Sequence, residues 1–211
     1  MLFRSGYPNQ GNFDTGPAPG QDRTHRFVAS YVWDLPKMTG ANHAIRALVG
    51  GWQWTGIFTY MTGDAMTILL GTDKSETALN GDHATFIGSL SQYGGTADPS
   101  SRAGCGSATC VPWLNTSLFL PVAQTPVGSF GNVGKGIFRG PGKFNVDTGL
   151  IKNFYPFKSE DLRFQLRGEF FNVLNHTQFN DPDVTRNDGN FGGIYGAADP
   201  RIIQLALKFF F

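Results

Sequence analysis

Large apolar residues recur at every second position in five segments of the chain, and this alternation constrains the fold more than any other feature. In the last segment, RIIQLALKFFF at residues 201–211, one side carries only large apolar side chains, namely Ile203, Leu205, Leu207, Phe209 and Phe211. A period of two is that of a β-strand, whose successive side chains point to opposite faces. The same period recurs in HRFVASYVWDLP (25–36), GWQWTGIFTYMTG (51–63), KFNVDTGLIKNF (143–154) and DLRFQLRGEFFNV (161–173). We therefore predict an all-β fold, an antiparallel meander of about five long strands.

The sequence gives no support for a nucleic-acid-binding protein or for a helical membrane protein. The chain has 17 basic and 16 acidic residues, so its net charge of +1 gives no electrostatic basis for binding nucleic acid. Only 16% of the residues are charged and 14% are aromatic, yet the mean hydropathy is −0.19. No unbroken apolar run approaches the ~20 residues that a transmembrane helix needs. These values suit alternating strands that are joined by polar connections.

The lengths of the strands and of their connections indicate a barrel in the bacterial outer membrane. Each segment is near the ~9–11 residues with which a tilted strand crosses a bilayer. Residues 155–160 are expected to form a short turn, and residues 36–51 a moderately short connection in which ANHAIRAL could form one or two helical turns. Residues 1–24 are expected to form an irregular loop, and residues 71–142 and 175–199 long extracellular loops. A soluble β-sandwich, in which the apolar face is simply core, is the alternative.

Several of these segments resemble one receptor family. HRFVASYVWDLP, FGNVGKGIFRGPG (130–142), RGEFFNVLNH (167–176) and PRIIQLALKFFF (200–211) occur in the order and spacing of the barrel end of TonB-dependent receptors of the Oar-like type. The resemblance covers most of residues 22–211. The segments FGNVGKGIFRGPG and RGEFFNVLNH are its most specific parts.

The resemblance implies that residues 1–211 are one C-terminal segment of a barrel of about 22 strands. Residues 1–211 contain no plug domain, and about five strands cannot close a barrel, so we expect a fragment of a longer receptor. Its partners would be outer-membrane lipid, the rest of the barrel and its plug, the barrel-assembly machinery, and TonB through the plug. The parent would take up a substrate that the sequence does not identify. A barrel with an adhesion or secretion-linked role is the alternative function.

The three terminal phenylalanines fit the same resemblance. In such barrels the last strand ends on an aromatic residue and is the signal that the assembly machinery reads. Leu207, Phe209 and Phe211 would face lipid, with the two phenylalanine rings in the periplasmic aromatic girdle. An ordinary edge strand that ends in a protein core is the alternative.

Two further sets of residues are candidate sites. Cys105 and Cys110, in CGSATC, are expected to form a small loop disulfide, with two reduced surface thiols as the alternative. On the polar face, which would line the barrel lumen, Arg163, Arg167 and Glu169 share one strand and Asp147 lies on the strand before it. A turn across residues 155–159 would place Asp147 within two positions of Arg167, close enough for an ion pair. These charges could equally contact a plug.

No motif predicts catalysis, a metal or a cofactor. The four histidines, His25, His43, His83 and His176, have no metal-binding spacing. The glycines of GNVGKG and GPGK lack the spacing of a phosphate-binding loop. The acidic run NDPDVTRNDGN, with Asp181, Asp183 and Asp188, lacks the Gly and Glu of a calcium loop, and Asx-type turns are expected there instead. We therefore expect that the chain is not an enzyme.

Overall fold

The computed structural model describes residues 16–40, 42–78, 81–94, 110–155 and 162–211. The chain divides into two compact units. The sheet unit comprises residues 26–61, 143–178 and 198–211, and the loop unit comprises residues 1–25, 62–142 and 179–197.

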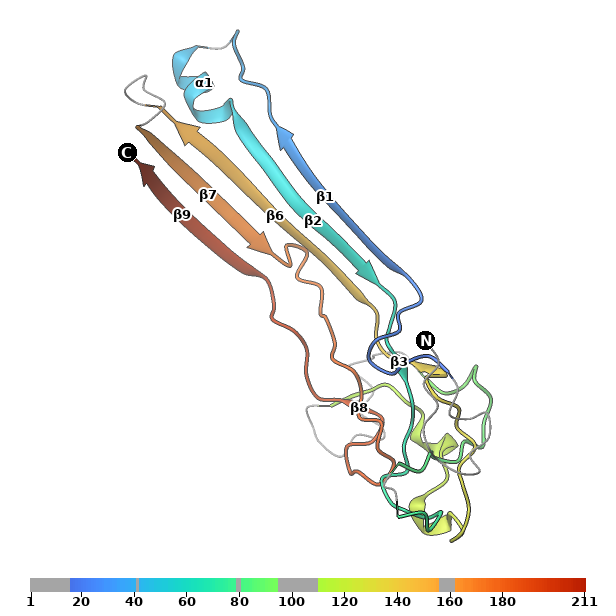
Figure 1. Ribbon diagram of the computed structural model, residues 1–211. Coiled ribbons are helices and arrows are strands. Elements are labelled where there is room, and N and C mark those ends of the chain that lie inside the picture. Colours follow the sequence, from blue (N-terminus) through green and yellow to red (C-terminus); the bar gives the residue numbers. More distant parts are fainter. Residues whose placement is uncertain (1–15, 41, 79–80, 95–109, 156–161) are drawn as a thin grey trace. The chain divides into compact units, whose positions relative to one another are not determined.

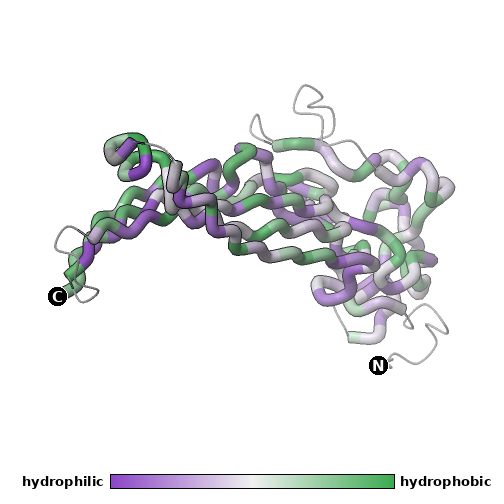
Figure 2. Tube along the Cα trace, turned by 90° about the horizontal axis from the view of Figure 1, so that it is seen from above, coloured by the Kyte–Doolittle hydropathy of each residue, from purple (hydrophilic) through white to green (hydrophobic). Residues whose placement is uncertain are grey.

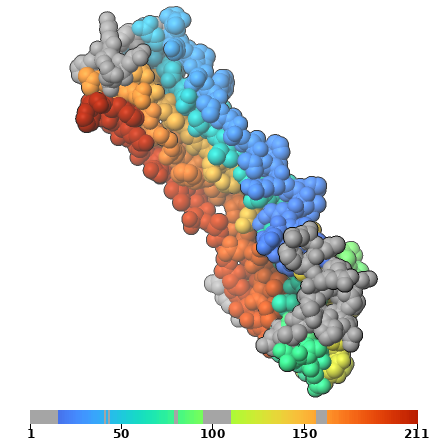
Figure 3. All heavy atoms as spheres, viewed as in Figure 1, coloured from blue at the N-terminus to red at the C-terminus, as the bar shows by residue number. Residues whose placement is uncertain are grey.

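The sheet unit is built on one five-stranded antiparallel sheet (Figure 1). Its strands, in spatial order, are β1 (Arg26–Asp34), β2 (Trp52–Met61), β6 (Lys143–Phe154), β7 (Arg163–Phe171) and β9 (Ile202–Phe210). In the space-filling view they appear as neighbouring bands from blue β1 to dark red β9 (Figure 3). Strands that follow one another within this unit are also neighbours in the sheet. The predicted all-β antiparallel meander is therefore confirmed.

The pairing register keeps the predicted apolar residues of all five strands on one face. One row runs across the whole sheet, in which each residue faces the next: Trp33, Trp54, Leu150, Gly168 and Leu205. Since side chains alternate along each strand, every other position in the sheet follows from this row. We call the side that carries these residues the apolar face, and the opposite side the polar face.

The apolar face is not covered by a second layer of the sheet unit. Trp54 is 38% exposed and Leu207 is 69% exposed. Aromatic rings contact one another along this face, with ring centroids 5.8 Å apart for Phe27 and Phe58 and 5.3 Å apart for Phe58 and Phe144. Figure 2 shows green, hydrophobic positions alternating with polar ones along the strands. An exposed apolar surface that extends over five strands needs a non-aqueous partner.

The connection between β1 and β2 contains the helix α1 (His43–Val49), as the sequence predicted. Asn42 caps it, with the side-chain oxygen accepting a hydrogen bond from the Ile45 N–H at 2.9 Å. Gly51, with φ of +71°, turns the chain back into β2. Within the described ranges, no helix is both long and apolar enough to cross a membrane.

The predicted ion pair between Asp147 and Arg167 is wrong, although both residues lie on the polar face. Arg167 faces Ile151, four positions along β6 from Asp147. The prediction centred the turn within residues 155–159, but β6 continues to Phe154 and β7 begins at Arg163. Moving the centre of the turn by two residues shifts the pairing by four. Arg167 instead pairs with Glu169 on its own strand, at 2.6 Å.

The loop unit has short regular elements around a core of its own. Its elements are β3 (Ala65–Met66), β4 (Val111–Pro112), η2 (Thr116–Leu118), η3 (Val122–Gln124), β5 (Phe138–Arg139) and β8 (Gly193–Ile194). β3 pairs with β5, and β4 pairs with β8. The centre of the core consists of Ile68, Phe119, Val133 and Phe138, each at most 1% exposed. The ring centroids of Phe119 and Phe138 are 5.5 Å apart, in an edge-to-face arrangement.

Candidate binding cavity in the loop unit

Three extended segments of the loop unit lie side by side and form the floor of a cavity. Residues 68–70 bond on one side to residues 82–84, through Leu70 N to Asp82 O at 2.7 Å and Ala84 N to Ile68 O at 3.0 Å. On the other side, Leu69 N donates to Val184 O at 3.0 Å and Arg186 N donates to Leu69 O at 2.8 Å. Ile68 and Leu70 point into the core with 0% and 1% exposure. Because side chains alternate along an extended chain, Leu69 points the other way, toward the cavity.

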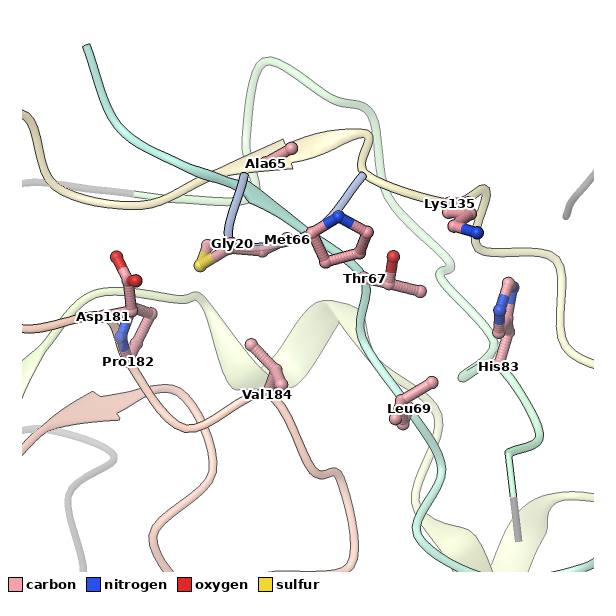
Figure 4. A pocket seen from close by; sticks show the side chains of 11 residues that line it. Gly20, Ala65, Met66, Thr67, Leu69, His83, Lys135, Asp181, Pro182 and Val184 are labelled. Atoms are coloured by element: carbon pink, nitrogen blue, oxygen red, sulfur yellow. The ribbon is translucent and has the colours of Figure 1, made fainter. Parts of the chain in front are cut away.

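The cavity has a volume of about 390 Å³. Its walls are mostly apolar and consist of Pro19, Ala65, Met66, Leu69, Pro182 and Val184. Figure 4 shows Met66, Val184 and Leu69 between two groups of polar side chains, with Lys135 and His83 at one end and Asp181 at the other. A concave apolar site with a few polar groups at its ends has the composition of a small-molecule site.

The orientation of His83 is fixed by a backbone carbonyl. Its Nδ1 lies 2.7 Å from Val133 O, and a carbonyl oxygen can only accept, so the neutral ring carries its proton on Nδ1. The residue is 6% exposed. Nearby, Thr67 Oγ1 accepts a hydrogen bond from Gly136 N at 2.8 Å. Gly136 has φ of +65°, which favours glycine, and this turn places the half-buried Lys135 at the rim.

Asp181 lies against a glycine at the other end of the cavity. A Cβ atom at Gly140 would come within 2.6 Å of Asp181 Oδ1, so no larger residue fits beside this carboxylate as it stands. A cation at one end and an anion at the other give the cavity a polarity along its length.

Two ion pairs hold the segment that forms the remaining rim. Arg23 pairs with Asp64, and Asp22 accepts from Arg139 Nη1 at 2.9 Å. Backbone bonds from Gly20 N to Ala65 O at 3.1 Å and from Ala65 N to Asp22 O at 3.0 Å fix the same segment beside β3. These contacts place Pro19 and Gly20 at the mouth of the cavity.

The predicted lumen charges lie on the polar face of the sheet unit. Asp147 Oδ1 accepts from Asn172 N at 2.8 Å and from Asn145 Nδ2 at 2.9 Å. Arg163 lies over the ring of Phe210, at 4.4 Å from its centroid. Because Gly149 has no side chain, Asp147, Glu169 and Thr55 line a hollow of about 360 Å³ there. Arg167 and Glu169 thus pair with each other, Asp147 is held by two asparagines, and the hollow beside Gly149 has two carboxylates in its lining.

Two of the predicted loop features are the Asx-type turns of the acidic run and the disulfide between Cys105 and Cys110. Asp183 Oδ1 accepts from Thr185 N at 2.7 Å and Asp188 Oδ1 from Asn190 N at 2.8 Å, which confirms Asx-type turns at both. Cys105 lies outside the described residues, so the disulfide with Cys110 stays a prediction. In the part of the chain that the structure describes, no group of three or more His, Cys, Asp or Glu side chains could hold a metal ion.

The terminal phenylalanines extend the apolar face. The rings of Phe209 and Phe164 stack at 4.8 Å, and those of Phe209 and Phe211 at 5.7 Å. Phe209 is 48% exposed and Phe211 is 94% exposed. Their predicted places in a lipid girdle and in an assembly signal stay predictions.

Comparison with known proteins gives one match. The model of a family described as an outer membrane beta barrel domain matches residues 4–204. No curated protein and no solved structure matches the chain.

Proposed function

The chain belongs to the outer membrane beta barrel domain family, whose place is the bacterial outer membrane, and from this premise we propose its function. We propose that it forms the last strands of the barrel of a TonB-dependent receptor of the Oar-like type. The resemblance of FGNVGKGIFRGPG and RGEFFNVLNH to that type supports this assignment. The parent receptor would take up a substrate with energy transmitted by TonB through a plug.

The open edges of the sheet support a larger barrel. Among the described strands, β1 and β9 each have one neighbour, so each offers a row of backbone groups to another strand. A strand edge in the hydrocarbon region of a membrane must be paired, because no water is present to satisfy it. The proposed neighbours are further strands of the same receptor.

The observation that carries the uptake proposal is the cavity of the loop unit. This unit is built from the segments that precede β1, connect β2 to β6 and connect β7 to β9. These segments are attached to one end of the sheet, and the chain terminates at the opposite end. In such barrels the chain terminates on the periplasmic side, so these segments would lie on the extracellular side. We assign the cavity to contact with the incoming substrate. The proposal gives the chain no catalytic role.

The polar face has a second proposed role. Its hollow at Gly149 and the charges of Asp147, Arg167 and Glu169 would contact the plug inside the barrel. The barrel-assembly machinery would read β9, with Leu207, Phe209 and Phe211 facing lipid.

The receptor assignment is tested on the protein as it occurs in the outer membrane. We expect a polypeptide that carries a plug ahead of these strands and that crosslinks to the periplasmic domain of TonB. A native protein of 23.0 kDa that does not crosslink would contradict the assignment. A longer barrel without a plug would favour the adhesion or secretion-linked role.

The cavity assignment is tested by filling the cavity. Val184→Trp places an indole between Leu69 and Met66, whereas Val127→Trp adds the same indole at a position that is 64% exposed and does not line the cavity. Cells with the natural protein are compared with cells lacking it, for removal of compounds from a mixture of peptides, oligosaccharides and iron chelates. We expect Val184→Trp, but not Val127→Trp, to lose the removal at an unchanged amount of receptor. Equal removal by both variants would contradict the assignment.

A further inference from the structure

The helix α1 presents an apolar side that the described part of the sheet unit does not cover. Ile45, Leu48 and Val49 are 47%, 70% and 52% exposed. Their spacing of three and four residues places them on one side of the helix. A seven-residue helix with three bare aliphatic side chains is unfavourable in water, so its surroundings need an explanation.

Two side chains of the apolar face hold the end of α1. Trp52 Nε1 donates to Leu48 O at 2.9 Å, and Lys152 Nζ donates to Gly50 O. Both residues lie on the same face as Trp54 and Leu150, as the register shows. The end of α1 is therefore held at the apolar side of the sheet, not at the polar side.

Lys152 is the one charged residue on the apolar face of the described strands. It is 3% exposed, and its Nζ lies 5.4 Å from the ring centroids of both Trp52 and Phe154. A lysine is tolerated beside lipid where its amine finds a carbonyl and aromatic faces near the headgroups. Tryptophan collects at the same depth. Lys152 and Trp52 thus have the contacts expected at the boundary between the hydrocarbon region and water.

We infer that α1 lies in the headgroup region of the periplasmic leaflet. Ile45, Leu48 and Val49 insert between the acyl chains, and Arg46, nearly opposite Leu48 around the helix, faces the lipid phosphates and water. The apolar side of α1 is continuous with the apolar face, because Trp52 and Lys152, which hold the end of the helix, belong to that face. In an outer-membrane barrel this face meets lipid. The end of the sheet that carries α1 also carries the end of β9, as Figure 1 shows. The inference rests on family membership and does not depend on the uptake proposal.

The test measures what surrounds each side of the helix in the full-length protein in outer-membrane vesicles. A fluorophore is attached to Leu48→Cys and, in a matched variant, to Arg46→Cys; the unsubstituted protein must take up no label. We expect brominated phospholipids to quench most of the Leu48→Cys fluorescence while aqueous iodide quenches little. The order should be reversed at Arg46→Cys.

Two outcomes would overturn the inference. Equal and strong quenching of both labels by iodide would place α1 in water. A Leu48→Cys label that neither quencher reaches would show that another protein segment covers it. As a second variant, Lys152→Met removes the bond to Gly50 O, and we expect it to shift the Leu48→Cys label from lipid toward iodide. Lys152→Arg keeps a donor and should preserve the lipid quenching.

Discussion

Asp82 is a fully buried acidic residue whose carboxylate is held by hydrogen bonds. It is 0% exposed, and its carboxylate accepts from Lys74 N at 2.7 Å, Ser75 N at 2.8 Å and Ser75 Oγ at 2.7 Å. A buried carboxylate is tolerated only when its oxygens are satisfied in this way. Asp82 O also accepts from Leu70 N, so the residue connects the floor of the cavity to residues 74–75.

Replacing Asp82 should loosen this part of the loop unit. Asp82→Ala removes the acceptor of the half-buried Lys74 N, Ser75 N and Ser75 Oγ, which costs about 3 kcal/mol of local stability. We expect the backbone amides of Leu70 and Ser75 to exchange with deuterium about a hundredfold faster, measured by native-state hydrogen exchange. Glu76→Ala, at an exposed position, should leave both rates unchanged. Unchanged rates in Asp82→Ala would show that the hydrogen bonds are not needed.

Individual residues were predictable from sequence only where their bonds are local. The turns at Asp183 and Asp188 were predicted because each carboxylate bonds an amide two residues ahead. The position of His83 was not, because its partner Val133 is fifty residues away. No local pattern marks such a contact. The composition of the cavity therefore follows only from packing.

At the scale of elements, the alternation predicted the faces of all five strands but not their register. The period of two fixes which side chains share a face. A shift of the register by an even number of residues leaves every side chain on the same face. Register also depends on the length of each turn, and the turn between β6 and β7 was placed too early. The error left Asp147 on the correct face but opposite the wrong part of β7.

Paired cysteines distinguish the two registers. Ile151→Cys with Arg167→Cys joins two residues that face each other, so a disulfide should form on oxidation. Asp147→Cys with Arg167→Cys joins positions about 13 Å apart along the strand and should stay reduced. Electrophoresis after thiol alkylation measures both. A disulfide in the second pair alone would restore the register predicted from sequence.

At the scale of the whole molecule, the sequence predicted the sheet but not the second unit. Residues 71–142 were expected to be a long loop because their apolar residues follow no period of two or of 3.6. They nevertheless provide Phe119, Phe138 and Val133 to a buried core. Short strands of two residues and backbone bonds between distant segments hold this core, and neither leaves a periodic signal.

The end of the chain should matter for assembly of the molecule in its membrane. Phe211→Ala removes a ring that is 94% exposed and contacts little of the described chain besides Phe209, so the stability of the folded sheet should change by less than about 1 kcal/mol. We nevertheless expect less protein in the outer membrane, measured by quantitative immunoblotting of membrane fractions. Phe211→Tyr should restore the amount. Equal amounts of all three proteins would rule out a role of the last ring in assembly.

Lipid is the expected partner of the apolar face, and a nitroxide scan along β9 tests this most directly. Single spin labels at residues 202–209 of the protein in its membrane report the access of oxygen, which concentrates in lipid, and of a water-soluble nickel chelate. We expect access to oxygen to peak at positions 203, 205, 207 and 209 and to fall at 202, 204, 206 and 208. Low access of both reagents at Leu205 and Leu207 would show that protein covers this face and would contradict the account.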